Sequence, residues 1–215
     1  MRKVLLSVAV LATMGTVHAT ATELEVSANA GVVSNYIWRG MTQTANNAAV
    51  QGGLDLAYGG LYAGTWASNV DFGSDATTEI DGYLGYAGEL AGIGYDLGYI
   101  KFGYVNEAAI NFDEVYFGLS KDFGMGSIGA TYSKGVSEDY ELSDIDVAAS
   151  LGLPQDYSLD LGWGDYEDVG SRMSAGISKS FDKVDFGIAY SAFSADDVSG
   201  LGDEKAVVVS VGTGF

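Results

Sequence analysis

The last eleven residues of the chain alternate between large apolar side chains and mostly small ones. The apolar set is Val207, Val209, Val211 and Phe215. A period of two is that of a β-strand with one apolar face. A strand that ends at Phe215 needs an edge to pair with, because an unpaired edge aggregates in water and is not tolerated in lipid. We expect the first strand to supply that edge, which would close the sheet into a barrel.

A strand that ends at an aromatic residue resembles the assembly signal of bacterial outer-membrane barrels. The resemblance implies that these four residues act in barrel closure and are read by the barrel-assembly machinery. Thr213 departs from the signal, in which a larger apolar residue is usual at that place.

The first residues predict a secretory signal peptide. Arg2 and Lys3 precede a mostly apolar stretch from Val4 to Val17, and Ala19 and Ala21 give two cleavage sites. The apolar stretch is short for a membrane helix, and a retained N-terminal anchor is the alternative. We therefore predict a signal peptide over residues 1–21 and an outer-membrane barrel over residues 22–215.

Composition narrows the chemistry of the mature chain. Without Arg2 and Lys3 the ten basic residues become eight, against 29 acidic ones, so the formal net charge is −21. This acidic excess argues against nucleic acid as a partner. The only histidine, His18, lies in the expected signal, and the chain has no cysteine. We predict no cofactor, no metal site and no catalytic residue.

Segments of alternating hydrophobicity recur along the whole chain, and none is long enough for a membrane helix. We expect an all-β fold, an antiparallel up-and-down transmembrane β-barrel of about twelve strands. Tight turns near Gly59, Asp122 and Pro154, and one over residues 88–92, alternate with longer connections. Short periplasmic turns and longer outer loops are typical of that architecture. Neither a plug domain nor a linker is expected, and an open pore and a pore plugged by the first loop are both left as alternatives.

The two faces of the expected strands differ in character. One is apolar, and the other is small and acidic and is expected to point inward, with Asp55, Asp96, Glu114, Asp146, Asp160 and Asp185. Aromatic residues at strand ends, Trp66 and Trp163 among them, are expected at the membrane interfaces. Because alternation does not fix which face points inward, a soluble lipocalin-like barrel is the alternative.

The segment Ser34-Asn-Tyr-Ile-Trp-Arg-Gly-Met-Thr-Gln-Thr44 stands out from the alternating pattern. Together with residues 49–53 and 62–73 it resembles the TorF family, a proteobacterial outer-membrane family without a settled substrate. The resemblance covers essentially the whole mature chain, with its strongest signatures in the first third. It implies an outer-membrane barrel and carries no active site with it.

Within this segment Tyr36, Trp38 and Arg39 are candidate residues of the outer mouth. Arg39 is one of few cations, so in an acidic lumen it would form a constriction or a cation–π contact. The alternative places Trp38 at the membrane interface as an anchor and pairs Arg39 with a loop carboxylate or with lipopolysaccharide.

Acidic residues gather in the expected outer loops. The candidates are Asp71, Asp75, Glu138, Asp139, Glu141, Asp165, Glu167, Asp168, Asp196 and Asp197, and Glu79, Asp81 and Asp144 are expected beside them. A ring of acids at the mouth would concentrate cations and repel anions. The alternative is a solvated surface that divalent ions link to lipopolysaccharide.

These observations predict an outer-membrane, porin-like channel for passive diffusion of small cationic or neutral solutes. The expected partners are outer-membrane lipid and lipopolysaccharide. A closed barrel that serves as a structural or adhesive platform is the second hypothesis. An enzyme that works without histidine, through carboxylates such as Asp144 and Asp146 or Asp96 and Glu114, is the third.

Overall fold

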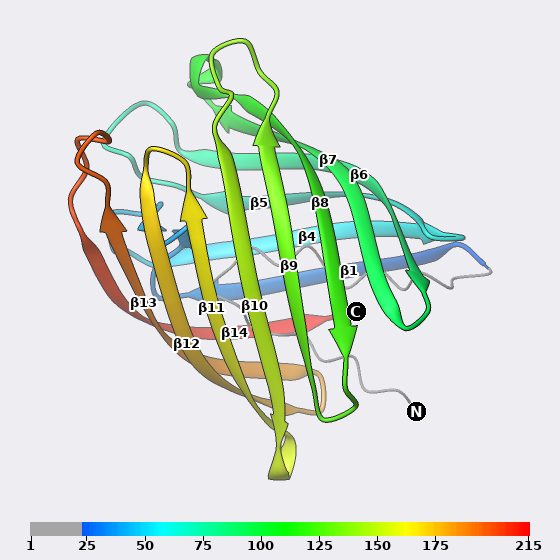
Figure 1. Cartoon of the computed structure of the whole chain (residues 1–215). Coiled ribbons are helices and arrows are strands. Elements are labelled where there is room, and N and C mark those ends of the chain that lie inside the picture. The colour runs from blue at the N-terminus through cyan, green and yellow to red at the C-terminus, as the bar shows by residue number, and fades with distance from the viewer. Residues whose placement is uncertain (1–22) are drawn as a thin grey trace.

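The computed structural model describes residues 23–215, so the predicted signal peptide lies outside the described residues. Twelve antiparallel strands close into one barrel (Figure 1). They are β1 (Glu25–Val33), β4 (Ala49–Tyr58), β5 (Leu61–Asn69), β6 (Thr78–Leu90), β7 (Ile93–Val105), β8 (Phe112–Asp122), β9 (Gly126–Gly135), β10 (Ser143–Leu153), β11 (Tyr157–Tyr166), β12 (Gly170–Phe181), β13 (Val184–Ala195) and β14 (Glu204–Gly214). The predicted fold class is confirmed.

The barrel closes where β14 pairs with β1, as the terminal strand predicts. The paired residues run from Asn29 opposite Gly214 to Val33 opposite Ser210. Beyond the last pair, Phe215 donates its backbone N–H to Ala28 O at 2.9 Å, and Ala28 donates to Phe215 O at 3.2 Å. The expected closure is therefore present, and Phe215 itself contributes backbone hydrogen bonds to it.

Short and long connections alternate between the two ends of the barrel. The short ones are Gly59–Gly60, 91–92, 123–125, the 3₁₀ turn η2 (Pro154–Asp156) and 182–183. The connections at the other end are 34–48, 70–77, 106–111 with η1 (Ala108–Ile110), 136–142, 167–169 and 196–203, and all of them except the three residues 167–169 are longer. The turn predicted over residues 88–92 is shorter in the structure. Strand β6 continues to Leu90, and the turn consists only of Ala91 and Gly92, both at positive φ.

The outward face of the barrel is apolar. Leu54, Leu84, Phe117 and Val209 are among the large hydrophobic side chains exposed on it. A soluble barrel would point such residues inward, so the soluble alternative is wrong. Within residues 23–215 no helix is long and apolar enough to cross a membrane.

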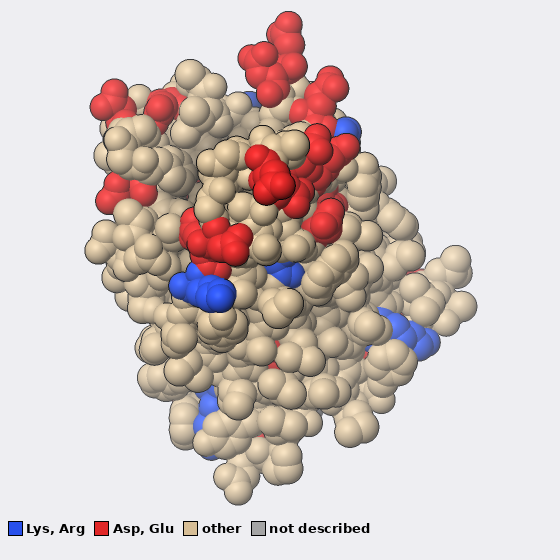
Figure 2. Space-filling view, turned by 60° about the vertical axis from the view of Figure 1, so that its left-hand side comes forward, with Lys and Arg blue, Asp and Glu red and all other residues tan. Residues whose placement is uncertain are grey.

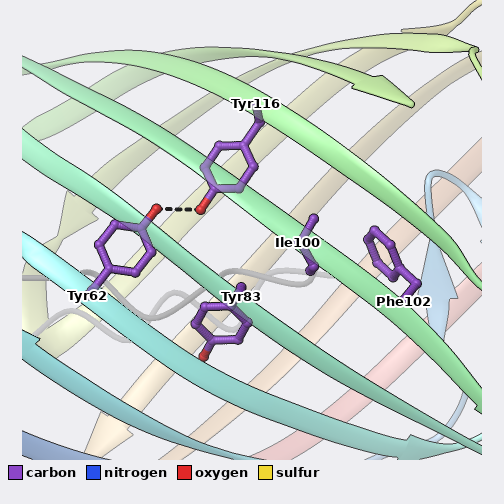
Figure 3. Packing of buried hydrophobic residues seen from close by; sticks show 5 residues of the cluster. All are labelled: Tyr62, Tyr83, Ile100, Phe102 and Tyr116. Atoms are coloured by element: carbon purple, nitrogen blue, oxygen red, sulfur yellow. Dashed lines mark hydrogen bonds between the residues drawn. The ribbon is translucent and has the colours of Figure 1, made fainter. Parts of the chain in front are cut away.

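The interior has two unlike walls. On β5 to β8 large side chains pack together, and we call this set the aromatic wall: Tyr62, Trp66, Tyr83, Ile100, Phe102, Tyr104, Phe112 and Tyr116. Figure 3 shows five of them, with the hydroxyls of Tyr62 and Tyr116 hydrogen-bonded to each other. Trp66 was expected at the membrane interface, but it lies inside because it shares the inward face of β5 with Tyr62.

Inward glycines make room for these rings. Tyr62 lies directly across the strand pair from Gly85, Tyr83 from Gly64, and Tyr116 from Gly98. A Cβ at Gly85 would overlap Tyr62 Oη and lie 2.7 Å from the backbone oxygen of Leu97. Each ring therefore covers the backbone of a neighbouring strand, an arrangement that pairs an aromatic residue with a glycine across a sheet.

Candidate functional site

The segment between β1 and β4 folds into the barrel instead of lying over its rim. Residues 34–48, which we call the inner hairpin, contain the short strands β2 (Ile37–Trp38) and β3 (Met41–Thr42). Arg39 and Gly40 join them with φ values of 48° and 87°, as a two-residue hairpin turn requires. Tyr36, Ile37, Arg39 and Thr44 are all buried. The sequence left open whether the first loop folds inward, and the structure places it in the lumen.

Tyr36 fixes one side of the inner hairpin to β5 and β6. Its hydroxyl donates to Glu79 Oε1 at 3.2 Å, and its ring meets Trp66 edge-on at a centroid distance of 5.3 Å. Burial, and next the negative charge of Glu79, raise the pKa of Tyr36 well above its usual value. The hydroxyl therefore stays protonated and keeps donating.

Trp38 lies in the lumen and does not anchor the barrel at the membrane interface, so that alternative is wrong. Its ring lies 5.9 Å from Phe102, 6.0 Å from Phe112 and 5.9 Å from Tyr166, measured between centroids. It therefore joins the aromatic wall to β11 on the far side.

Arg39 lies in the lumen and makes the cation–π contact predicted for it, and it also pairs with carboxylates of β8 and β10, not with a loop carboxylate. Its Nη1 and Nη2 bind Glu114 at 2.7 and 2.9 Å, and its Nε lies 3.3 Å from Asp144 Oδ2. The guanidinium also lies 4.4 Å from the Trp38 ring and 4.7 Å from the Tyr166 ring. Burial alone would lower the pKa of Arg39, but the charge and hydrogen bond of Glu114 together with the charge of Asp144 outweigh it, so the pKa is raised.

Tyr140, from the connection 136–142, reaches the same group. It accepts from Arg39 Nη1 at 3.0 Å and lies 2.7 Å from Glu114 Oε1. Burial raises the pKa of Tyr140, although the charge of Arg39 opposes that rise. An outer connection thus helps to hold the inner hairpin in place.

A second arginine, Arg172 on β12, completes this charge network. Its Nη1 and Nη2 bind Asp144 at 2.6 and 2.8 Å, and it also pairs with Asp146. Arg172 lies flat across Gly164, where a Cβ would overlap its guanidinium. Sequence reasoning missed Arg172, although a cation on the small, polar face of an alternating segment was a usable signal.

The six acids predicted to point inward all do so, but not as one group. Asp55 accepts from Tyr83, Asp96 from Tyr62 at 2.6 Å, and Asp185 from Ser180 at 2.5 Å. Glu114 and Asp146 bind the two arginines, and Asp160 lies on β11. Asp96 and Glu114 therefore do not form the carboxylate pair that an acid–base enzyme would use.

Three acids expected near the outer loops lie inside instead. Glu79 and Asp81 are inward residues of β6 with exposed fractions of 1% and 4%, and Asp144 of β10 is equally buried. They follow directly on outer connections, so sequence distance placed them near the loops. Alternation along β6 and β10 points these three side chains into the barrel, and this decides their position.

The remaining loop acids lie at the end of the barrel that carries the long connections. Asp71 and Asp75 belong to connection 70–77, and the others to 136–142, 167–169 and 196–203, except Asp165, which is still part of β11. Figure 2 shows acidic side chains gathered at this end, uppermost in the view. Glu167 accepts from the Ser143 side chain and backbone, which lowers its pKa. Within the described residues no group of three or more His, Cys, Asp or Glu side chains could hold a metal ion.

Solved structures with a similar fold are outer-membrane proteins. The KdgM porin in complex with disordered oligogalacturonate matches with a TM-score of 0.62 at 6% identity, over 88% of this chain and 97% of that one. The NanC porin matches with 0.60 at 12% identity, over 88% and 99%. Outer membrane phospholipase A from Escherichia coli matches with 0.53 at 11% identity, over 88% and 89%. At these identities the likeness shows the fold alone.

A comparison with curated proteins gives no match. A family model described as a bacterial protein of unknown function (Gcw_chp) matches residues 18–209, which is most of the chain. The resemblance to the TorF family stays a prediction. The chain belongs to the Gcw_chp family of bacterial proteins, whose description gives no function.

Proposed function

We propose that this protein is an outer-membrane channel through which small solutes diffuse, and that it prefers cations. The observation that carries the proposal is a barrel with an apolar outside and an acidic inside, narrowed near one end by the inner hairpin. The fold is that of outer-membrane porins, which supports the outer membrane as its location. Lipopolysaccharide around the rim and the assembly machinery at β14 are the partners we propose with it.

The charge of the lumen supports the preference for cations. Within residues 23–215 the inward-pointing cations are Arg39 and Arg172, and both are already paired with carboxylates. Inward acids outnumber them, and the loop acids add negative charge at the long-connection end. A mouth and lumen that carry charge of one sign concentrate ions of the opposite sign and repel ions of the same sign. We therefore expect a polyanion such as the oligogalacturonate of the KdgM complex to be a poor solute here.

The inner hairpin supplies the constriction in this proposal. Inward residues towards the short-turn end, such as Ser120 and Ala148, are exposed. Those at the level of the hairpin, such as Phe102, Arg172 and Phe193, are buried. Resistance to flow would therefore be greatest at the hairpin, near the long-connection end.

A closed barrel that acts as a platform is the second candidate. It is favoured by the spread of the contacts that the inner hairpin makes around the lumen. Besides β5 to β8, β10 and β11, it reaches β14, where Thr42 N donates to Glu204 Oε2 at 2.9 Å and Ser34 N to Val209 O at 2.8 Å.

We propose no enzymatic activity. The phospholipase shares the fold, but the only histidine of this chain is His18, in the expected signal peptide. A histidine-dependent mechanism would therefore have no base in the mature barrel.

The test is conductance in a planar bilayer under a KCl gradient, with the refolded mature chain and a variant whose residues 35–47 are replaced by a short Gly/Asn turn. Folding is checked for both by the heat-dependent shift in gel mobility. We expect small, cation-selective steps from the wild type and steps about twofold larger or more from the variant. Anion selectivity would contradict the preference for cations. A silent wild type beside a conducting variant would favour the closed platform.

A further inference from the structure

The inward acids of the barrel fall into two classes, according to which protein groups bind their carboxylates. On the side of the aromatic wall, Asp55 and Asp96 accept from tyrosine hydroxyls, and Glu114 is bound by Arg39. One oxygen of Asp55, one of Asp96 and both oxygens of Glu114 are therefore engaged by protein donors. These carboxylates fix the aromatic wall and the inner hairpin in place.

On the opposite wall Asp146 is paired with Arg172 and Asp185 accepts from Ser180, whereas Asp160 is paired with no described arginine or lysine. Asp146 Oδ1 and Asp160 Oδ1 have no hydrogen-bond partner among the described residues, and neither has Arg172 Nε. The side chain of Asp146 is 26% exposed, and Asp160 is half-buried. Polar atoms inside a protein normally have a partner, so the unpartnered oxygens mark places on this wall where hydrogen-bonding capacity is not used by the protein.

Sheet register spaces these acids evenly. Asp160 on β11 lies opposite Ser150 on β10. Ser150 is four residues from Asp146 along β10, in the direction of the short-turn end, which we take as the bottom of the barrel. Asp160 also faces Gly176 on β12, and Asp185 on β13 faces Ser180, four residues further down β12. Each step is about 13 Å along the strands, since a residue advances the chain by roughly 3.3 Å. Asp146, Asp160 and Asp185 thus form a staircase from the inner hairpin towards the short-turn end.

The wall between these acids carries small side chains. They are Ala148, Ser150, Gly162, Ser174, Gly176, Ser178 and Ser191. A small pocket opens at its upper end, directly beside the tip of the inner hairpin, where Gly40, Asp146, Arg172, Ser174 and Ser191 line it. Space next to the hairpin therefore lies on this wall, while the aromatic wall is filled.

The carboxyls of Glu79 and Asp81 also have unpartnered oxygens, but their setting differs. Their exposed fractions are 1% and 4%. Tyr36 donates to Glu79, and Trp66 and Tyr104 lie opposite Asp81 and Glu79 in the sheet. Both acids are therefore buried more deeply than Asp146 and Asp160. They are therefore left out of the staircase.

We propose that cations cross this barrel off-centre, along a lane on β10 to β13 where Asp146, Asp160 and Asp185 are successive binding stations. The lane takes small monovalent cations or a solute bearing one ammonium group, because each station offers a single carboxylate and neighbouring hydroxyls. Asp160 is the specificity-determining residue, since the arginines do not neutralise it. This proposal rests on the proposed channel function.

The first experiment compares two charge-neutral variants, Asp160→Asn and Asp96→Asn. Both carboxylates point into the barrel, one on the lane and one on the aromatic wall, and the amide oxygen introduced by Asp96→Asn would still accept from Tyr62. We expect Asp160→Asn to lower the cation-to-anion permeability ratio, from the reversal potential under a KCl gradient, by about twofold or more. Asp96→Asn should leave it near the wild-type value. Equal effects from the two variants, or a larger one from Asp96→Asn, would overturn the lane and leave the channel standing.

The second experiment does not depend on conductance. The chain has no cysteine, so Ser150→Cys places a single thiol on the lane beside Asp160. We expect a cationic methanethiosulfonate reagent to modify this thiol faster than an anionic one. The preference for the cationic reagent should fall in the double variant Ser150→Cys/Asp160→Asn. It should persist in the double variant Ser150→Cys/Asp96→Asn. A silent wild-type barrel would overturn the proposed channel. Equal rates for the two reagents at the introduced thiol would overturn the lane, whatever the conductance.

Discussion

At the scale of single residues, glycine decides where the large side chains of the lumen can lie. Tyr62, Tyr83 and Tyr116 each cross a glycine of the neighbouring strand, and Arg172 crosses Gly164 in the same way. The inward glycines therefore do not simply widen the pore. On one wall they are the places where rings lie flat, and the result is a filled half of the lumen.

Gly85→Ala tests this packing. The new Cβ would approach both the Tyr62 hydroxyl and the Leu97 backbone oxygen, and the backbone cannot move aside. We expect a loss of about 1–3 kcal/mol in the free energy of unfolding, as for other overpacked interiors. Urea unfolding in lipid vesicles, followed by tryptophan fluorescence, measures it.

The matched control lies on the same strand. Gly82 of β6 faces outward, and a Cβ there would meet nothing within 4 Å. Gly82→Ala should leave the unfolding midpoint unchanged or slightly raised. If the two variants behaved alike, the close contact at Gly85 would not be the cause.

At the scale of elements, three of the groups that hold the inner hairpin keep their protonation state in alkali. The pKa values of Arg39, Tyr36 and Tyr140 are all raised. A group with a raised folded pKa stabilises the fold fully below its unfolded pKa and loses that contribution only as the pH rises through the folded value. For the tyrosines that loss begins above about pH 10, and for Arg39 higher still.

We therefore expect the conductance of the wild type to stay constant from about pH 7 to about pH 10. Planar-bilayer recordings across that range check this, with the variant lacking residues 35–47 as the control for changes in the barrel itself. A rise in conductance confined to the wild type within this range would show that the hairpin is released, and that these three groups do not hold it.

At the scale of the whole molecule, the seam between β1 and β14 is the shortest strand pairing in the barrel wall. It has five residue pairs, whereas β1 and β4 share nine. The two backbone hydrogen bonds between Phe215 and Ala28 extend it at the short-turn end. The last residue of the chain is thus part of the closure.

Deleting Phe215 should remove both of these bonds and lower the free energy of unfolding by about 1–3 kcal/mol. Phe215→Ala keeps the backbone bonds and loses only an exposed side chain, so it should cost less. Urea unfolding of the two variants beside the wild type separates the backbone from the ring. Equal losses would mean that the ring, and not the backbone pairing, stabilises the seam.

The sequence by itself determined the barrel, because strand alternation is a local property. Side chains two residues apart share a face, so the separation of an apolar face from a small, acidic face that holds Asp55 and Asp160, and the closing role of residues 205–215, can be read along the chain. Alternation alone did not fix which face points inward, and the closed sheet, with its large apolar side chains on the outside, decided it. The path of the inner hairpin could not be read in this way. Arg39 is held by Glu114, 75 residues away, and Tyr140, 101 residues away, so its position depends on the closed sheet. For the same reason only the tertiary structure separates the acids that tyrosines and arginines engage from Asp160, since register between distant strands decides which donor each carboxylate meets.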